Sequence, residues 1–362
     1  MSDVAARLAE RARRYGPLSF DVVVNEALYG PEGFYERGHG AGRSRDFLTS
    51  PEVGPLFGLL LSRALDGWWT DLEEPDPFVV IEGGAGAGAL AAAVLAAAPR
   101  CAGALRWIAV ERSSALRALL AGRLPIEPPE QVLGPRGAGG GPAVAVMDDL
   151  PGGPFVGVVI ANELLDNLAP IVVERTVDAW AEVRADAAPG EGLVEVCVPA
   201  SANLARAGDR WAPGAACGSR AALHRQAARW LQRAMGTLEA GRVVCFDYGA
   251  PTTVALVERG GWLRTYADHG VGGGWLDDLG RQDVTVDVGF DQLAPGSLRG
   301  QAEWLTTLGI ADLRAEAVAT WDAGRAVGDL ASLRARSRVH EADALCDANG
   351  LGGFLVAEWT KR

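Results

Sequence analysis

Cysteine and histidine are scarce in this chain of 362 residues. The five cysteines are scattered and form no Cys-x-x-Cys pair. This usage is typical of reduced thiols, so a cytoplasmic location is expected. The four histidines lack the spacing of metal ligands, and no metal site is expected.

Positive charge and long apolar runs are also lacking. Lys and Arg together number 34 against 46 Asp and Glu, which gives a net charge of −12. This balance argues against a nucleic-acid partner, because phosphate contacts need a basic face. No apolar run approaches the roughly 20 residues of a membrane span, and the N-terminus lacks the apolar stretch of a signal peptide, so no membrane partner is expected.

Glycine is abundant, and its most informative use is in residues 78–88, Phe-Val-Val-Ile-Glu-Gly-Gly-Ala-Gly-Ala-Gly. The apolar run predicts a buried strand, the glycines a tight turn, and the alanine-rich segment that follows a helix. Glycine permits positive φ and lets a ligand approach the backbone closely. Such a turn places an adenosine-containing cofactor at the carboxyl edge of a parallel sheet.

Two strand-end acids indicate which cofactor is bound. Glu82 ends the first strand, where it would repel a pyrophosphate but suits the sulfonium and ammonium groups of S-adenosylmethionine (SAM). Glu111 ends the next apolar run, where an acid can accept both ribose hydroxyls. We therefore expect Glu82, Gly84, Gly86, Gly88 and Glu111 to bind SAM. A structural glycine turn beside a surface Glu is the alternative.

Alternating apolar runs and helical patterns predict an α/β fold with a parallel sheet and right-handed crossovers. An antiparallel hairpin is expected over residues 170–184. The predicted strands are 78–82, 105–110, 143–147, 155–161, 193–198, 242–247 and 354–359, and the predicted helices are 3–15, 19–28, 55–69, 88–98, 113–123 and 219–240.

The turn after the fourth strand carries the first candidate for acceptor chemistry. Asn162 and Glu163 can present an amide and a carboxylate to an acceptor nitrogen, with Asp166 close behind. The alternative is that Asn162 only caps a short helix and that Glu163 lies in its first turn.

A polar loop, Arg45 to Glu52, is the second candidate. Its hydroxyl groups can instead cap the helix that follows, with Pro51 in the first turn. Asp148 and Asp149 follow the third strand, where an acid can accept from the adenine amino group, although a solvated turn is an alternative. Further polar segments are Asp247-Tyr-Gly249, Leu263–Tyr266 with His269, and Gln282–Thr285.

These segments together resemble the MidA-like SAM-dependent methyltransferases, whose mitochondrial members are complex I assembly factors that methylate arginine. The resemblance covers nearly the whole chain. It rests on the segments Leu28–Tyr35, Asp46-Phe-Leu-Thr-Ser-Pro-Glu52, Phe57-Gly58, Glu82–Gly88, Asn162-Glu-Leu-Leu-Asp166 and Asp247-Tyr-Gly249.

The resemblance implies a Rossmann-like class I sheet of seven strands, mostly parallel, with additional helices covering the site. It also implies a cap over residues 1–72 and a core over 73–362, with 170–240 inserted as part of the substrate cap. Asp46, Thr49 and Ser50 are expected beside SAM. Glu52, Asn162, Glu163 and Asp166 are expected around the transferred methyl group. Arg45, Ala85, Ala169 and Asp287 depart from the family pattern.

We therefore expect an enzyme that transfers a methyl group from SAM, yielding S-adenosylhomocysteine, to a protein arginine. A small-molecule N- or O-methyltransferase and a non-catalytic assembly factor that docks on a partner remain alternatives. The acceptor is thus a protein or a small molecule, and a homodimer is possible. A nicotinamide dehydrogenase is disfavoured by Glu82 and by the glycine spacing.

Overall fold

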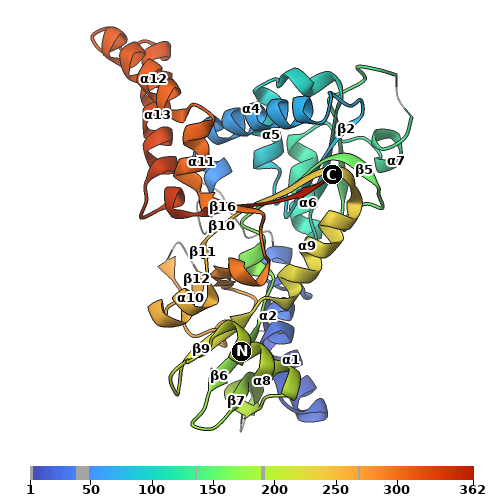
Figure 1. Cartoon of the computed structure of the whole chain (residues 1–362), viewed down its shortest axis with the longest axis vertical. Coiled ribbons are helices and arrows are strands. Elements are labelled where there is room, and N and C mark those ends of the chain that lie inside the picture. Colours follow the sequence, from blue (N-terminus) through green and yellow to red (C-terminus); the bar gives the residue numbers. More distant parts are fainter. Residues whose placement is uncertain (1–2, 38–48, 136, 189–191, 268–269) are drawn as a thin grey trace.

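A seven-stranded sheet forms the upper part of the molecule (Figure 1). The structure, a computed structural model, describes residues 3–37, 49–135, 137–188, 192–267 and 270–362. The strand order is β16-β17-β10-β5-β2-β3-β4. The strands β10, β5, β2, β3 and β4 pair parallel with their neighbours, and β17 pairs antiparallel with both β10 and β16. The predicted α/β fold with a mostly parallel sheet is confirmed. In sheet order the bounds are β16 Ser297–Gly300, β17 Leu355–Lys361, β10 Leu238–Asp247, β5 Phe155–Asn162, β2 Phe78–Gly83, β3 Leu105–Val110 and β4 Ala143–Met147.

Helices cover both faces of this sheet, which explains why every residue of β2 and β3 is buried. Phe78 and Val80 pack in the core that contains α4 (Pro55–Asp71) and α5 (Ala89–Ala96). Val79 and Ile81 pack in the opposite core, which contains α9 (Arg225–Thr237). Successive side chains of a strand point to opposite faces, so one apolar run supplies both cores.

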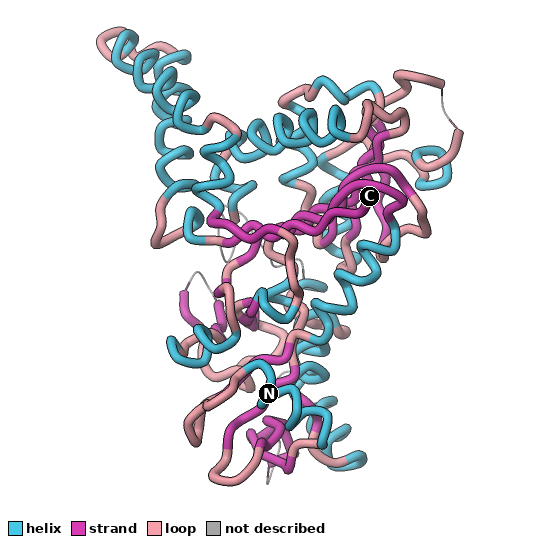
Figure 2. The backbone as a smooth tube through the Cα atoms, in the orientation of Figure 1, coloured by secondary structure: helices cyan, strands magenta, loops and turns pink. Residues whose placement is uncertain are grey.

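A second sheet lies in the lower part of the molecule (Figure 2). Its central strands β6 (Ile171–Arg175) and β7 (Trp180–Ala188) form the predicted antiparallel hairpin. The strands β1 (Leu18–Ser19), β8 (Gly192–Pro199) and β9 (Arg220–Leu223) complete it. Helices that pack against this sheet include α1 (Asp3–Tyr15), α2 (Phe20–Tyr29) and α8 (Ala202–Trp211).

The predicted helix over residues 219–240 is wrong at both ends. Residues 220–223 form β9, which pairs antiparallel with β6, and α9 gives way to β10 at Leu238. Pairing with β6 overrides the helix propensity of Ala221 and Ala222. Between β3 and β4 the chain also forms the short helix α7 (Pro129–Val132).

Several elements were not predicted. The helices α12 (Ile310–Gly324) and α13 (Leu330–Cys346) form a hairpin that projects from the body at the upper left of Figure 1. A small sheet, β13-β12-β14, lies below the main sheet. The other short elements that were not predicted are α3 Ser50–Val53, α10 Thr253–Arg259, α11 Gln301–Thr307, β11 Gly249–Ala250, β12 Leu263–Ala267, β13 Gly270–Val271, β14 Asp283–Val286 and β15 Val288–Gly289. The helix predicted over residues 113–123 is α6 (Ser114–Arg123). Within the described ranges, none of the helices combines the length and apolarity that a membrane crossing requires.

Close packing between α4 and α5 depends on Gly58. A Cβ added at Gly58 would lie 2.4 Å from the Cβ of Ala93 and 2.8 Å from its backbone carbon. Glycine is therefore required for the distance at which α4 approaches α5. Because α5 begins directly after the glycine turn, this contact also fixes the helix that follows the turn.

We expect Gly58→Val to lower the free energy of unfolding by about 1–3 kcal/mol, because the added methyl groups force α4 away from α5. Urea denaturation measures the change. The matched control is Gly67→Ala on the same helix, where an added Cβ meets nothing within 4 Å. That variant should gain about 0.5–1 kcal/mol, since it removes a helical glycine. Equal effects at the two positions would contradict the packing argument.

Candidate active site

A cavity of about 610 Å³ lies at the carboxyl edge of the main sheet. It is large enough to hold a drug-sized ligand. The strand ends that border it are aligned, since Gly83 pairs with Val110 and with Ala161, and Asn162 pairs with Phe246. Residues that follow these strand ends are therefore brought to one edge, as the parallel sheet predicts.

Two buried acids stand at one end of the cavity. Glu82, 3% exposed, accepts a hydrogen bond of 2.9 Å from Trp107 Nε1. Glu111, 5% exposed, accepts from the backbone N–H groups of Gly86 and Ser113, each at 2.8 Å. Burial raises the pKa of Glu82 to about 8, against the opposing effect of the Trp107 bond. Burial also raises the pKa of Glu111, and its two backbone donors oppose that rise.

The three glycines of the turn share the left-handed region but have different surroundings. Their φ values are 68° at Gly84, 54° at Gly86 and 77° at Gly88. A Cβ at Gly86 would meet no atom within 4 Å, so this position faces open space. A Cβ at Gly84 or Gly88 would instead press on Leu164 or Leu120. Gly88 does not line the cavity.

The turn after β5 supplies the opposite end of the cavity. Glu163 has a left-handed φ of 52°, which is strained for a residue with a Cβ. Its backbone N–H donates to the carbonyl of Phe246 at 2.8 Å, and Asp247 accepts from the N–H of Leu165 at 2.8 Å. Asn162 is the last residue of β5 and caps no helix. The turn is therefore held by β10 and presents side chains that are not used as caps.

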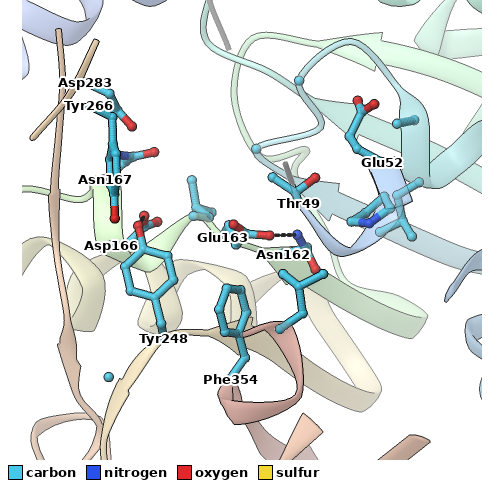
Figure 3. Close-up of a pocket in the computed structure, with 18 of the residues that line it drawn as sticks. Thr49, Glu52, Asn162, Glu163, Asp166, Asn167, Tyr248, Tyr266, Asp283 and Phe354 are labelled. Atoms are coloured by element: carbon cyan, nitrogen blue, oxygen red, sulfur yellow. Dashed lines mark hydrogen bonds between the residues drawn. The ribbon is translucent and has the colours of Figure 1, made fainter. Parts of the chain in front are cut away.

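Asn162 and Glu163 are paired. Asn162 Nδ2 donates to Glu163 Oε1 at 3.0 Å (Figure 3). Burial raises the pKa of Glu163 to about 8, and the nearby charge of Asp166 adds to the rise. The bond from Asn162 and the backbone N–H of Ser50 oppose it. Glu163 is thus protonated in much of the neutral range unless a cation stands beside it.

Asp166 is held by two hydroxyl groups. Its Oδ2 accepts from Tyr248 and, at 2.7 Å, from Thr285. Its Oδ1 is buried and has no hydrogen-bond partner in the described structure, and the same is true of Asn162 Oδ1. Buried acceptor atoms are rarely left unpaired, so these two oxygens indicate a ligand that brings N–H or O–H donors.

The other sequence-predicted residues divide into three groups. Thr49 and Glu52 line the cavity and lie on the opposite side of Glu163 from Asp166 (Figure 3). Ser50 is fully buried and bonded to Gln301, while Asp148 and Asp149 are exposed, and none of the three lines the cavity. Asp149 forms an ion pair with Arg233 at 2.7 Å. Asp46, Arg45 and His269 lie outside the described residues.

The candidate site residues named from the sequence did not include several that line the cavity. Tyr248 and the segments around Tyr266 and Asp283 carried a signal, because each is a polar run beside an apolar strand. Residues 348–354 carried none beyond glycine content. The additional lining residues include Tyr29, Tyr35, Tyr248, Arg259, Arg264, Tyr266, Asp283, Asp287, Asn349 and Phe354.

Comparisons with known proteins agree with this geometry. Residues 60–308 match the family described as “Putative S-adenosyl-L-methionine-dependent methyltransferase”. The mouse mitochondrial protein arginine methyltransferase NDUFAF7 is 26% identical over 308 residues, which are 79% of this chain and 67% of that protein. Its Drosophila melanogaster homologue is 36% identical over 93 residues, 25% of this chain and 21% of the fly protein.

A solved structure shares the fold over almost its full length. It is a COG1565 superfamily member from Burkholderia thailandensis bound to S-adenosyl-homocysteine, with a TM-score of 0.80 and 24% identity. The superposition covers 99% of this chain and 92% of that chain.

The cofactor of this chain is S-adenosyl-L-methionine, and the glycine-turn end of the cavity fits it. Gly86 leaves space for a ligand against the backbone, and Glu111 lies at the end of β3, where the cofactor's ribose is expected. Glu82 offers a buried carboxylate to the ligand's positive charges. Because a cation favours the ionised acid, binding should lower the pKa of Glu82 and release its proton.

Below a pKa of about 8 Glu82 is mostly neutral in the free protein, so SAM binding there requires its deprotonation. We expect the ratio of Kd values for Glu82→Gln over wild type to rise roughly tenfold from pH 7 to pH 8.5. Using the ratio cancels titration of the ligand's own amino group. Calorimetric titration measures both constants, and a flat ratio would contradict a role for the Glu82 charge.

Proposed function

The chain belongs to the family of SAM-dependent methyltransferases matched by residues 60–308, and from this we propose that it methylates a guanidinium nitrogen of a protein arginine. The arginine methyltransferases of mouse and fly are distant relatives, and their matched segments span two thirds and about a fifth of those proteins. The proposal therefore depends chiefly on the chemistry of the cavity.

The observation that carries it is the pair of unpartnered oxygens, Asn162 Oδ1 and Asp166 Oδ1, on either side of Glu163. A guanidinium has five N–H donors in one plane and no acceptor. It can therefore bond to several acceptor oxygens at once. A hydroxyl acceptor has one donor and would leave most of these oxygens unpaired.

The charges at this end of the cavity favour the same ligand. Burial raises the pKa of Glu163 and of Asp166, so ionising these carboxyl groups is costly without a positive partner. A guanidinium stays protonated in water, with a pKa of about 12.5–13.8. Its arrival would ionise the acids and supply the counter-charge they lack.

Bound SAM supplies a methyl group on a sulfonium; the N–C bond forms as the C–S bond breaks, and the electron pair stays on sulfur. Glu163 and Asp166 orient the attacking nitrogen by accepting hydrogen bonds from its two N–H groups. The nitrogen must lose one proton, and the Glu163 carboxylate accepts it. The positive charge of the guanidinium favours the ionised form of Glu163, which is the form that can accept this proton.

Thr49 and Glu52 border the cavity beside the turn. Their side chains lie across the cavity from Asp166 (Figure 3). We place them at the methyl-transfer region rather than on the acceptor nitrogen. Transfer requires the acceptor and the methyl carbon to be held in line at roughly 3–3.5 Å. It also requires water to be excluded from this region.

The function is tested with labelled SAM and an extract of cells that lack the endogenous protein. Protein and small-molecule fractions are separated, and the labelled protein is hydrolysed to amino acids. We expect label in methylarginine. Label confined to small molecules would favour a metabolite methyltransferase, and SAM binding without any transfer would favour an assembly factor.

We expect Glu163→Gln to reduce turnover by a factor on the order of 10²–10³ while leaving the Kd for SAM near that of wild type. The substitution keeps the shape and an acceptor oxygen but removes the charge and the base. Transfer from labelled SAM to the protein fraction is the measurement. The control is Glu130→Gln on exposed α7, which should match wild type. Unchanged turnover in Glu163→Gln would exclude Glu163 as the base.

A further inference from the structure

Two arginines stand among the acids of the cavity. Arg259 is the last residue of α10, and Arg264 is the second residue of β12. They are the only cationic side chains among the described residues that line the cavity. Seven lining residues carry carboxyl groups: Glu52, Glu82, Glu111, Glu163, Asp166, Asp283 and Asp287.

Asp287 joins the two arginines without neutralising both. It is 2% exposed, and each guanidinium donates a hydrogen bond to one of its oxygens. One carboxylate against two guanidiniums leaves one positive charge. The side chains of Arg259 and Arg264 are 52% and 36% exposed, so this charge remains accessible from the cavity.

Arg264 also contacts the end of the cavity formed by Asn162, Glu163 and Asp166, which we call the acceptor end. Its guanidinium lies 4.6 Å from the centre of the Tyr248 ring, and the hydroxyl of Tyr248 bonds to Asp166. The Nε atom of Arg264 is buried and has no hydrogen-bond partner in the described part of the chain. The unused positive charge therefore stands one aromatic ring away from the oxygens assigned to the methylated guanidinium.

We propose that Arg259 and Arg264 form a subsite for a carboxylate of the acceptor, located close to the arginine that is methylated. The inference rests on the proposed function. The carboxylate comes either from an Asp or Glu side chain near that arginine or from a C-terminal carboxyl group. We call Arg259, Arg264 and Asp287 the arginine rim.

The chemistry of the arginine rim fits this ligand. Guanidinium and carboxylate groups form paired, charge-assisted hydrogen bonds with a fixed geometry. Asp287 accepts a hydrogen bond from the Nη2 atom of each arginine. A guanidinium has five N–H donors, so others remain on both side chains. An acceptor with a cation and a nearby anion would thus match a cavity that holds both the acids Glu163 and Asp166 and the arginine rim.

The test uses the acceptor protein whose arginine is labelled in extract, together with wild-type enzyme and Arg259→Gln. Every Asp or Glu within three residues of the labelled arginine is replaced in turn by Asn or Gln. If the arginine lies at the C-terminus, one residue is added after it to move the carboxylate. For the wild-type enzyme, we expect one of these changes to lower kcat/KM about tenfold. The same change in the acceptor should lower kcat/KM of the Arg259→Gln enzyme by no more than about twofold.

The control enzyme is Arg123→Gln, an exposed arginine at the end of α6, which should discriminate like wild type. Methylarginine formed with no carboxylate near it, or with no loss on removing one, overturns the subsite and leaves the proposed function standing. A tenfold loss that persists in Arg259→Gln also overturns the subsite. Absence of methylarginine overturns the proposed function and the subsite with it.

Discussion

The acceptor end of the cavity depends on the carboxylate of Asp247 at the end of β10. One of its oxygens accepts from the N–H of Leu165 at 2.8 Å, and the other accepts from the N–H of Tyr248 at 3.0 Å. The first bond holds the turn that presents Glu163. The second holds Tyr248, which contacts Asp166. Burial and the charges of Asp166 and Glu163 raise the pKa of Asp247 well above its usual range. Asp247 therefore positions Glu163 and Asp166, although the charges of these two acids disfavour its own ionisation.

Such a cluster of buried carboxyl groups costs stability, because each must be neutralised or must bear an uncompensated charge. The apolar sheet beneath it offsets this cost, since β2 and β3 are buried along their whole length between helices. The cavity thus combines a rigid support with a cluster of acids whose ionised form a positive ligand stabilises. A strained site on a stable scaffold is a common compromise between stability and activity.

Local sequence was sufficient for six strands of the main sheet and for Glu82, Glu111 and Glu163, whereas β16 was not predicted. Each acid directly follows or ends an apolar run, and parallel strands bring their carboxyl ends to one edge. Arg264 and Asp283 lie in polar segments that the sequence analysis named, but no role was assigned to either residue, because both reach the cavity through a small sheet whose position depends on tertiary packing. The error over residues 219–240 has the same origin, since Ala221 and Ala222 form a strand only when β6 is beside them. Asp46 stays a prediction.

The position of β17 has a consequence for the order in which the protein becomes competent. β17 lies between β10 and β16, and the segment before it, Ala348–Phe354, lines the cavity, with Phe354 against the ring of Tyr248. The chain is synthesised from its N-terminus, so β2 and the glycine turn emerge long before this wall. The cofactor end can thus take shape on the ribosome while the acceptor end is still open.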